Sequence, residues 1–348
     1  MGTAFLYSFP FFVFVDTSAL PTLKEVTVDK VRVRFYPLFR SGVANFIPMP
    51  PIKPQQIPFA PDVKVSFSAE SVFPTLAVIP KLGLSEKGKA SICYMLSHEW
   101  PKPLQEFPMD SLRVDVFGTD KEKAENISNK LVLDFLKLLR CKSRQWWIEH
   151  AAPVGNLRGR FPVLENSKPV GEQPEPRCKM FTACGDERVV DNELWQSTLT
   201  ELERGLVAPF YELLTLDARY FAITSNIPLS VLNAALACEQ ARDVHFERLW
   251  HLKARGLHYK PGRIIRGNHL PVHLSSDLLR LTGNMHSYKK ESPAEFAIIE
   301  NLWDARGNVA HGRSVQYIED GSLYVVDERK AMEFVKTVEH CLRWLENL

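Results

Sequence analysis

Hydrophobic and polar positions follow two different periods along the chain. In the first half they alternate, most clearly at residues 26–35, 63–67 and 112–117. A period of two is typical of β-strands that bury one face. The apolar stretch from Ala4 to Val15 is also interpreted as a strand. We therefore expect the first half to consist mainly of strands and loops.

The placement of proline supports this expectation. Nineteen of the 24 prolines lie before residue 180. Long helices do not tolerate that density, whereas sheet edges and connections do. One amphipathic helix is expected within this half, near residues 127–140, and residues 162–185 are predicted to be a linker because they show neither period. The first half is therefore predicted to be an antiparallel β-rich domain, sandwich-like or barrel-like.

From Asn192 onward the hydrophobic spacing becomes that of helices. One helix is expected to begin near Pro228. Its predicted core-facing residues are Leu229, Leu232, Leu236, Phe246 and Leu249. A second helix is expected to follow a capping box at Ser292–Glu295, and the last one to span residues 331–345. The second half is therefore predicted to be an all-α helical bundle.

These patterns predict an α+β protein of two domains. The β-rich domain is expected at residues 1–180 and the helical bundle at residues 181–348. The length agrees with this division, because 348 residues is about twice a typical domain. With 24% charged and 45% hydrophobic residues, the composition excludes a wholly disordered chain and a coiled-coil rod.

Charge and cysteine content narrow the expected partners and cofactors. The net charge of +2 gives no global attraction to nucleic acid, so a site for a polyanion must be local. The six cysteines show no C-x-x-C spacing, and Cys178 and Cys184 have no histidine nearby. We expect no metal and no cofactor. The Ala4–Val15 stretch is too short to cross a bilayer and the first basic residue is Lys24, so we expect a cytoplasmic protein without a membrane partner.

The helix that follows Ser292 carries the candidate chemistry. Its hydrophobic stripe at residues 296, 299 and 303 extends to Arg306, whose guanidinium is expected to point toward a core or an interface. That group keeps its charge and therefore needs a carboxylate or a phosphate as partner. His311 follows five residues later. Histidine exchanges protons near neutral pH, and arginine neutralises charge that grows on a phosphate.

Arg306, four further residues and His311 resemble the motif of the HEPN superfamily, as does the sequence Ala310-His311-Gly312. The resemblance covers residues from about 190 to 348, since the family also places one final amphipathic helix after this motif. HEPN proteins of the RNase type are metal-independent endoribonucleases that act as dimers. The resemblance implies that His311 is the acid or base for attack by the 2′-hydroxyl and that Arg306 binds the scissile phosphate.

The spacing of the two residues bears on the oligomeric state. Five residues at about 100° each place them about 140° apart on an ideal helix, so one helix alone brings them together poorly. We therefore expect a homodimer or a higher homo-oligomer. Gly307 stands where the family often has Asn, Asp or His, and Asn308 is a candidate for the missing polar contact with His311. The alternative is that His311 and Gly312 simply end the helix.

A basic segment lies between Arg248 and Ser276 and contains no Asp or Glu. We expect it to contact the RNA backbone without reading sequence, unless it is only a solvated helix end and loop. Its candidate RNA-binding residues are Lys253, Arg255, Lys260, Arg263 and Arg266. A second mixture of basic and aromatic residues surrounds Trp146 and Trp147, which we expect to pack in the core.

The sequence thus predicts an RNA-cleaving effector of the toxin or antiphage abortive-infection type. Its β-rich domain would sense a trigger or bind an antitoxin. One alternative is a non-catalytic HEPN-like module for dimerisation or for binding nucleotides or nucleic acid, beside a β domain that recognises a ligand. Another is a β domain that binds carbohydrate or protein, with the bundle as a scaffold.

Overall fold

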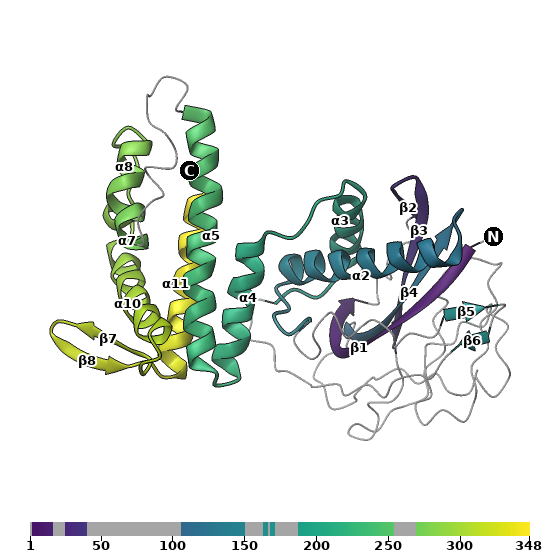
Figure 1. Ribbon diagram of the computed structural model, residues 1–348, viewed down its shortest axis with the longest axis horizontal. Helices are drawn as coiled ribbons and strands as arrows, with labels where there is room; N and C mark the ends of the chain where they lie inside the picture. Colours follow the sequence, from purple (N-terminus) through teal and green to yellow (C-terminus); the bar gives the residue numbers. More distant parts are fainter. Residues whose placement is uncertain are drawn as a thin grey trace. The chain divides into compact units, whose positions relative to one another are not determined.

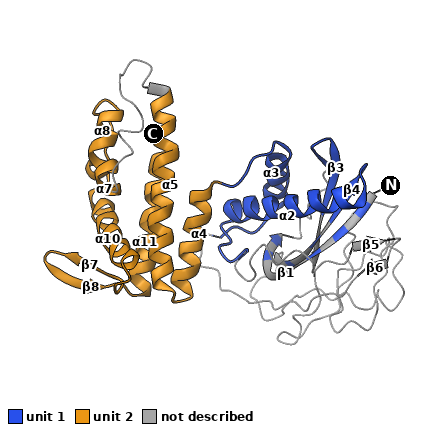
Figure 2. Cartoon of the chain, in the orientation of Figure 1, with its two compact units in different colours: residues 1–208 blue, residues 209–348 orange. Residues whose placement is uncertain are grey.

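The computed structural model describes residues 2–16, 25–39, 106–149, 163–165, 168–170, 187–253 and 269–348. Helices and strands are both present, with an antiparallel sheet in the N-terminal part and helices in the C-terminal part (Figure 1). The chain divides into two compact units, Met1–Ala208 and Pro209–Leu348 (Figure 2). We call them the first unit and the second unit. The predicted strand at residues 63–67 lies outside the described residues.

One six-stranded antiparallel sheet forms the centre of the first unit, in the order β2-β3-β4-β1-β5-β6. The strands are β1 (Gly2–Asp16), β2 (Glu25–Val28), β3 (Val31–Phe39), β4 (Glu106–Phe117), β5 (Val163–Glu165) and β6 (Lys168–Val170). The predicted alternation is confirmed, because Val31, Val33 and Phe35 are buried whereas Arg32 is exposed. β5 and β6 pair within the stretch that was predicted to be a linker.

A helical layer packs on this sheet. The expected helix near residues 127–140 is confirmed as α2 (Lys121–Ser143), which Figure 1 shows crossing the strands of the sheet. The Phe135 ring of α2 lies 5.1 Å from the Phe35 ring of β3. Among the described residues, no second sheet faces the first. The apolar face of α2 buries against the described sheet. The predicted sandwich or barrel stays a prediction.

The boundary between the units falls between Ala208 and Pro209 and not near residue 180. The reason is α3 (Asn192–Glu203), which we expected in the helical bundle. Its Trp195 ring packs edge-on against Phe135 at 4.9 Å, and its Glu203 accepts a hydrogen bond of 3.0 Å from the Thr27 backbone. These contacts fix α3 in the first unit.

The two adjacent tryptophans are core residues, as expected. Trp146 and Trp147 are both fully buried, and their rings meet edge to face at 5.2 Å. The indole nitrogen of Trp146 donates to Glu187 at 2.7 Å. Their burial leaves no ring face on which a nucleic-acid base could stack.

The second unit is mainly helical. Its elements are α4 (Phe210–Ile223), α5 (Ile227–Lys253), α7 (Leu270–Val272), the π-helix η4 (His273–Asp277), α8 (Leu278–Leu281), α9 (Tyr288–Glu291), α10 (Pro293–Ala310), β7 (Gln316–Glu319), β8 (Ser322–Val325) and α11 (Glu328–Glu346). The hairpin of β7 and β8 corrects the expectation of an all-α bundle. Asp320 and Gly321 both have positive φ at its turn, 48° and 75°, as a tight two-residue hairpin requires.

No helix in the described part of the chain has both the length and the apolar run that crossing a bilayer requires.

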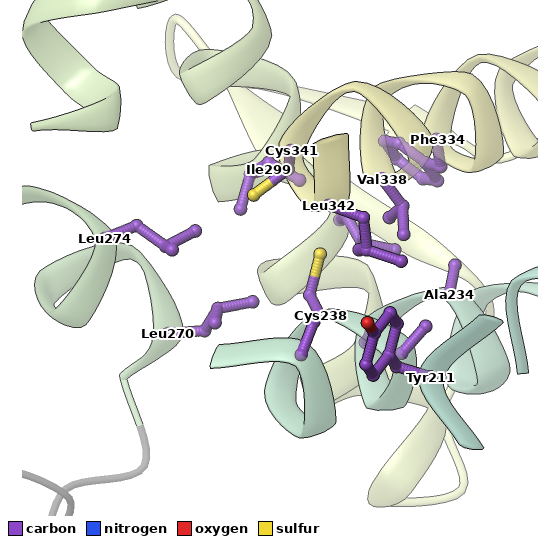
Figure 3. Packing of buried hydrophobic residues seen from close by; sticks show 14 of the residues in the cluster. Tyr211, Ala234, Cys238, Leu270, Leu274, Ile299, Phe334, Val338, Cys341 and Leu342 are labelled. Atoms are coloured by element: carbon purple, nitrogen blue, oxygen red, sulfur yellow. The ribbon is translucent and has the colours of Figure 1, made fainter. Parts of the chain in front are cut away.

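Small side chains of α5 form the centre of the core (Figure 3). Ala234 and Cys238 are fully buried, and Figure 3 shows them beside Val338 and Leu342 of α11. The predicted stripe on α5 is partly wrong, because Leu229 is 38% and Leu236 37% exposed. The predicted Phe246 and Leu249 are buried. α5 packs against α4, α10 and α11 together, so close approach favours alanine over leucine.

Two buried histidines are expected to make the stability of the second unit depend on pH. Burial, and then Arg248, lowers the pKa of His245, and burial followed by Arg242 lowers the pKa of His273. Among the described residues neither ring nitrogen of His245 has a hydrogen-bond partner. Below the ordinary value of 6.5 the unfolded chain therefore binds protons that the folded chain does not. The folded state is therefore fully stable with respect to these two histidines above pH 6.5. It loses stability as the pH falls toward their lowered pKa values.

We expect the free energy of unfolding of the second unit to fall between about pH 7 and about pH 5. Urea titrations at several pH values measure it. His245→Phe should reduce the loss, because the phenyl ring takes up no proton and fits beside the Tyr211 ring, 5.8 Å from His245. A pH profile that His245→Phe leaves unchanged would contradict this assignment.

Candidate functional site

The end of α10 carries the candidate site, and a glycine terminates that helix. The helix begins at Pro293 as expected, although the Ser292 side chain makes no capping hydrogen bond. Gly312 has a φ of 69°, and its N–H donates to the Val309 carbonyl at 2.9 Å. His311 is therefore the C-cap and Gly312 adopts the left-handed conformation after it, which confirms the expected helix end. Whether His311 has a chemical role besides is a separate question.

His311 uses only its backbone to end the helix. Its side chain is exposed, and among the described residues its imidazole has no hydrogen-bond or ion-pair partner. An exposed imidazole without a partner can exchange protons with a bound substrate. The capping role of the backbone and a chemical role of the side chain are therefore compatible.

Arg306 lies on the surface between α10 and α5. Its Nη2 is 3.4 Å from Oε1 of Glu239, and the guanidinium lies over the Trp303 ring, 5.0 Å from its centre. The side chain is 36% exposed. The expected anionic partner is thus a carboxylate within the chain. The exposed part of the guanidinium retains donors for a second anion.

The described contacts do not join Arg306 to His311. Arg306 pairs with Glu239 of α5, whereas the exposed His311 imidazole has no partner among the described residues. On an ideal helix the two positions are about 140° apart. A second copy of the chain is one way to bring both groups to the same phosphate.

Asn308 contacts the hairpin and not His311. Its Nδ2 donates to the Gln316 carbonyl at 2.9 Å. One turn earlier, Asp304 accepts a hydrogen bond of 2.8 Å from the Ile318 N–H. Asn301 lies on the same side of α10 and donates to Glu319 at 2.9 Å. The three polar residues at positions 301, 304 and 308 therefore hold β7 against α10, and their helical spacing was the sequence signal for this role.

The basic segment is described only at its edges. Lys253 ends α5, while Arg255, Lys260, Arg263 and Arg266 lie outside the described residues. At the N-terminal edge, Arg248 donates to the Leu345 carbonyl at 3.2 Å. At the other edge, His273 is buried with its Nδ1 2.8 Å from Arg242. The RNA-binding role of the segment remains a prediction.

Gly307 occupies open space within α10, because a Cβ at this position would meet no atom within 4 Å. We expect Gly307→Ala to raise the free energy of unfolding of the second unit by about 0.5–1 kcal/mol, since alanine loses less backbone entropy in a helix. Urea denaturation measures this change. Gly307→Asn introduces a polar residue that HEPN proteins often have at this place, and if the chain cleaves RNA as they do, we expect the rate to increase. A lower rate in Gly307→Asn would contradict a contribution of this position to the site.

The chain matches no protein-family model, no curated protein and no solved structure in the comparisons with known proteins. The resemblance to HEPN proteins therefore rests on Arg306, His311 and the order of the last two long helices. Within the described residues no group of three His, Cys, Asp or Glu side chains is arranged to hold a metal ion.

Proposed function

We propose that the second unit is a metal-independent endoribonuclease whose site combines Arg306 and His311 from two copies of the chain. The observation that carries the proposal is the exposed His311 imidazole without a partner, on the same helix as a guanidinium that is partly exposed. Together they supply an imidazole that can accept a proton and a fixed positive charge. RNA cleavage through its own 2′-hydroxyl needs no metal ion, and solvent can protonate the leaving oxygen.

The reaction follows from these two roles. His311 accepts the proton of the 2′-hydroxyl, whose oxygen forms a bond to the adjacent phosphorus. The bond from phosphorus to the 5′ oxygen breaks, and solvent supplies a proton to that oxygen. Arg306 stabilises the negative charge that grows on the phosphate oxygens. The products are a 2′,3′-cyclic phosphate and a 5′-hydroxyl.

Glu239 positions Arg306 in this scheme. A carboxylate 3.4 Å away and an aromatic ring beneath the guanidinium restrict its motion before a substrate binds. An incoming phosphate would bind the exposed N–H groups of the Arg306 guanidinium, while Glu239 keeps its contact with the same guanidinium. In the proposed dimer, the phosphate on Arg306 of one copy meets His311 of the other.

The experiment is an RNA cleavage assay with the full chain in EDTA. We expect cleavage with cyclic phosphate and 5′-hydroxyl ends, and none of an oligonucleotide that lacks 2′-hydroxyls. Sedimentation of the same sample should show at least a dimer. Cleavage that requires a divalent metal ion, or no cleavage of any RNA tested, would contradict the proposal.

The biological role that fits such an activity is an effector of the toxin or antiphage abortive-infection type, acting in the cytoplasm. An unregulated ribonuclease harms its own cell, so a second part of the chain must restrain it. The first unit is the candidate for this restraint, through a trigger or an antitoxin that it recognises. This assignment rests on the arrangement of the chain in two units.

A second candidate is a non-catalytic module for dimerisation or nucleic-acid binding. Two observations favour it. Glu239 already neutralises part of the Arg306 charge, and Asn308 is committed to the hairpin. Under this alternative the protein binds RNA without cleaving it, which the same assay distinguishes.

A further inference from the structure

A groove of about 700 Å³ lies between α10 and α11, away from the candidate site. Its α10 wall comes from Glu295 and Ile298 in the first half of that helix, whereas His311 is the C-cap. At a rise of 1.5 Å per residue, Ile298 and His311 are about 20 Å apart along the helix. The groove is therefore a separate feature of the second unit.

Three cations of α11 line this groove. Arg329, Lys336 and Arg343 follow one another at intervals of seven residues, which places them on one face of the helix. Among the described residues, no carboxylate forms an ion pair with any of the three. Arg343 donates from Nε to the Glu339 carbonyl at 3.2 Å, which leaves its two terminal nitrogens available. A concave surface with uncompensated cations favours an anionic ligand.

The two carboxylates of the groove do not balance these cations. Glu333 pairs with Lys330 at 3.1 Å, so its charge is already compensated. Glu295 remains as the one other carboxylate in the lining. The described lining therefore keeps an excess of positive charge.

His340 adds a neutral donor to the same groove. Its Nδ1 is 2.9 Å from the hydroxyl of Tyr288. Burial raises the pKa of Tyr288 far above its usual range, so the hydroxyl stays protonated. We assign the hydroxyl as the donor to Nδ1, which places a ring hydrogen on Nε2. That N–H is a further hydrogen-bond donor for an anion.

The apolar part of the lining is formed by Ile298 and Met332. Both are partly buried and pack against the core cluster. A ligand that used the whole groove would thus carry anionic groups for α11 and a nonpolar surface for these two side chains. The volume lies in the range of small-molecule sites, about 300–1,000 Å³.

We infer that this groove binds a nucleotide unit, with its phosphates at Arg329, Lys336 and Arg343 and its base against Ile298 and Met332. Arginine binds phosphate oxygens through paired N–H groups, and the thioether of methionine packs favourably on aromatic rings. The unit belongs either to a free nucleotide or to a single strand of nucleic acid. The inference does not depend on RNA cleavage, because none of these residues belongs to the end of α10.

Calorimetry with the full chain tests the inference, with ATP, inorganic triphosphate and a single-stranded oligodeoxynucleotide as probes. We expect ATP to bind more tightly than inorganic triphosphate, because only ATP uses the apolar lining. Arg329→Gln and Lys336→Gln should each weaken ATP binding about tenfold. Arg280→Gln is the matched control, since Arg280 is an exposed arginine of α8 outside the groove.

Glu295→Gln separates binding from folding, because removal of the remaining carboxylate should strengthen ATP binding about threefold. A damaged fold would not produce such a gain. If the same variants weaken binding of the oligodeoxynucleotide by a similar factor, a single strand is the ligand; if they affect ATP alone, a free nucleotide is. Equal binding of ATP and inorganic triphosphate, or ATP binding that Arg329→Gln and Lys336→Gln leave unchanged, would overturn the inference.

Discussion

His311→Ala is expected to reduce the rate of RNA cleavage by about 10²- to 10⁴-fold, the usual contribution of a positioned general base. Arg306→Ala should cost about 10²- to 10³-fold, because it removes the charge that stabilises the phosphate in the transition state. Both rates are measured under single-turnover conditions in EDTA. The His311 side chain is exposed, so the melting temperature of the His311 variant should hardly change.

Arg313→Ala is the control for these variants. Arg313 is an exposed cation two residues after His311, and its backbone N–H completes the helix end by donating to Asn308. The alanine variant keeps that bond and should cleave RNA at a rate close to the wild type. If His311→Ala instead unfolds the second unit, or cleaves as fast as Arg313→Ala, His311 is only a helix terminator.

Arg219→Met is expected to lower the free energy of unfolding of the second unit by about 3–5 kcal/mol. Nη2 of Arg219 on α4 lies 2.7 Å from Oε1 of Glu339 on α11, and the two side chains are 4% and 9% exposed. Removing the guanidinium leaves the Glu339 carboxylate buried without this partner, which costs more than the attraction itself. The expected loss is a large share of the stability of a typical domain, about 5–15 kcal/mol. Urea denaturation, followed by helical circular dichroism, measures it.

Two further variants test the reason for that loss. Arg219→Met combined with Glu339→Leu removes both charges and should recover most of the stability. Arg280→Met breaks the exposed pair with Asp277, which should cost at most about 1 kcal/mol. A loss in Arg219→Met as small as that in Arg280→Met would contradict a structural role for the buried pair.

Local periodicity predicted the elements that bury one face and expose the other. The alternation around Val31, Val33 and Phe35 became β3, and the stripe from Ala331 to Leu345 became the buried face of α11. Both patterns depend only on neighbouring residues along the chain. The end of α10 could be predicted for the same reason, because His311 and Gly312 are a local helix-stop signal.

Features set by tertiary contact were harder to predict. The layer that covers the first sheet is α2, and nothing in the strand pattern specifies whether a helix or a second sheet fills that place. On α5, leucines marked the predicted core face, while the close approach of three helices buried Ala234 and Cys238.

The hairpin of β7 and β8 was missed although the sequence could have predicted it, since Asp320-Gly321 between two short β-like runs is a strong turn signal.

In the candidate site, too, local sequence predicted some features, while others depend on tertiary contacts. Spacing correctly indicated that Arg306 needs an anionic partner, but Glu239 lies on another helix and cannot be identified from local sequence. Asn308 was assigned to His311 because the two are near each other on one helix. The structure directs its amide to the hairpin, a contact that follows from tertiary packing.

Mixing the inactive Arg306→Ala and His311→Ala chains tests the central claim most directly. In a mixed dimer, one shared site loses both groups, while the other combines the intact Arg306 of one chain with the intact His311 of the other. We therefore predict that two samples of greatly reduced activity will regain RNA cleavage in EDTA after subunit exchange, with each mixed dimer keeping about half of the sites. Mixed dimers that form, as shown by mass spectrometry, and yet remain as inactive as either variant alone would contradict a site shared between two copies.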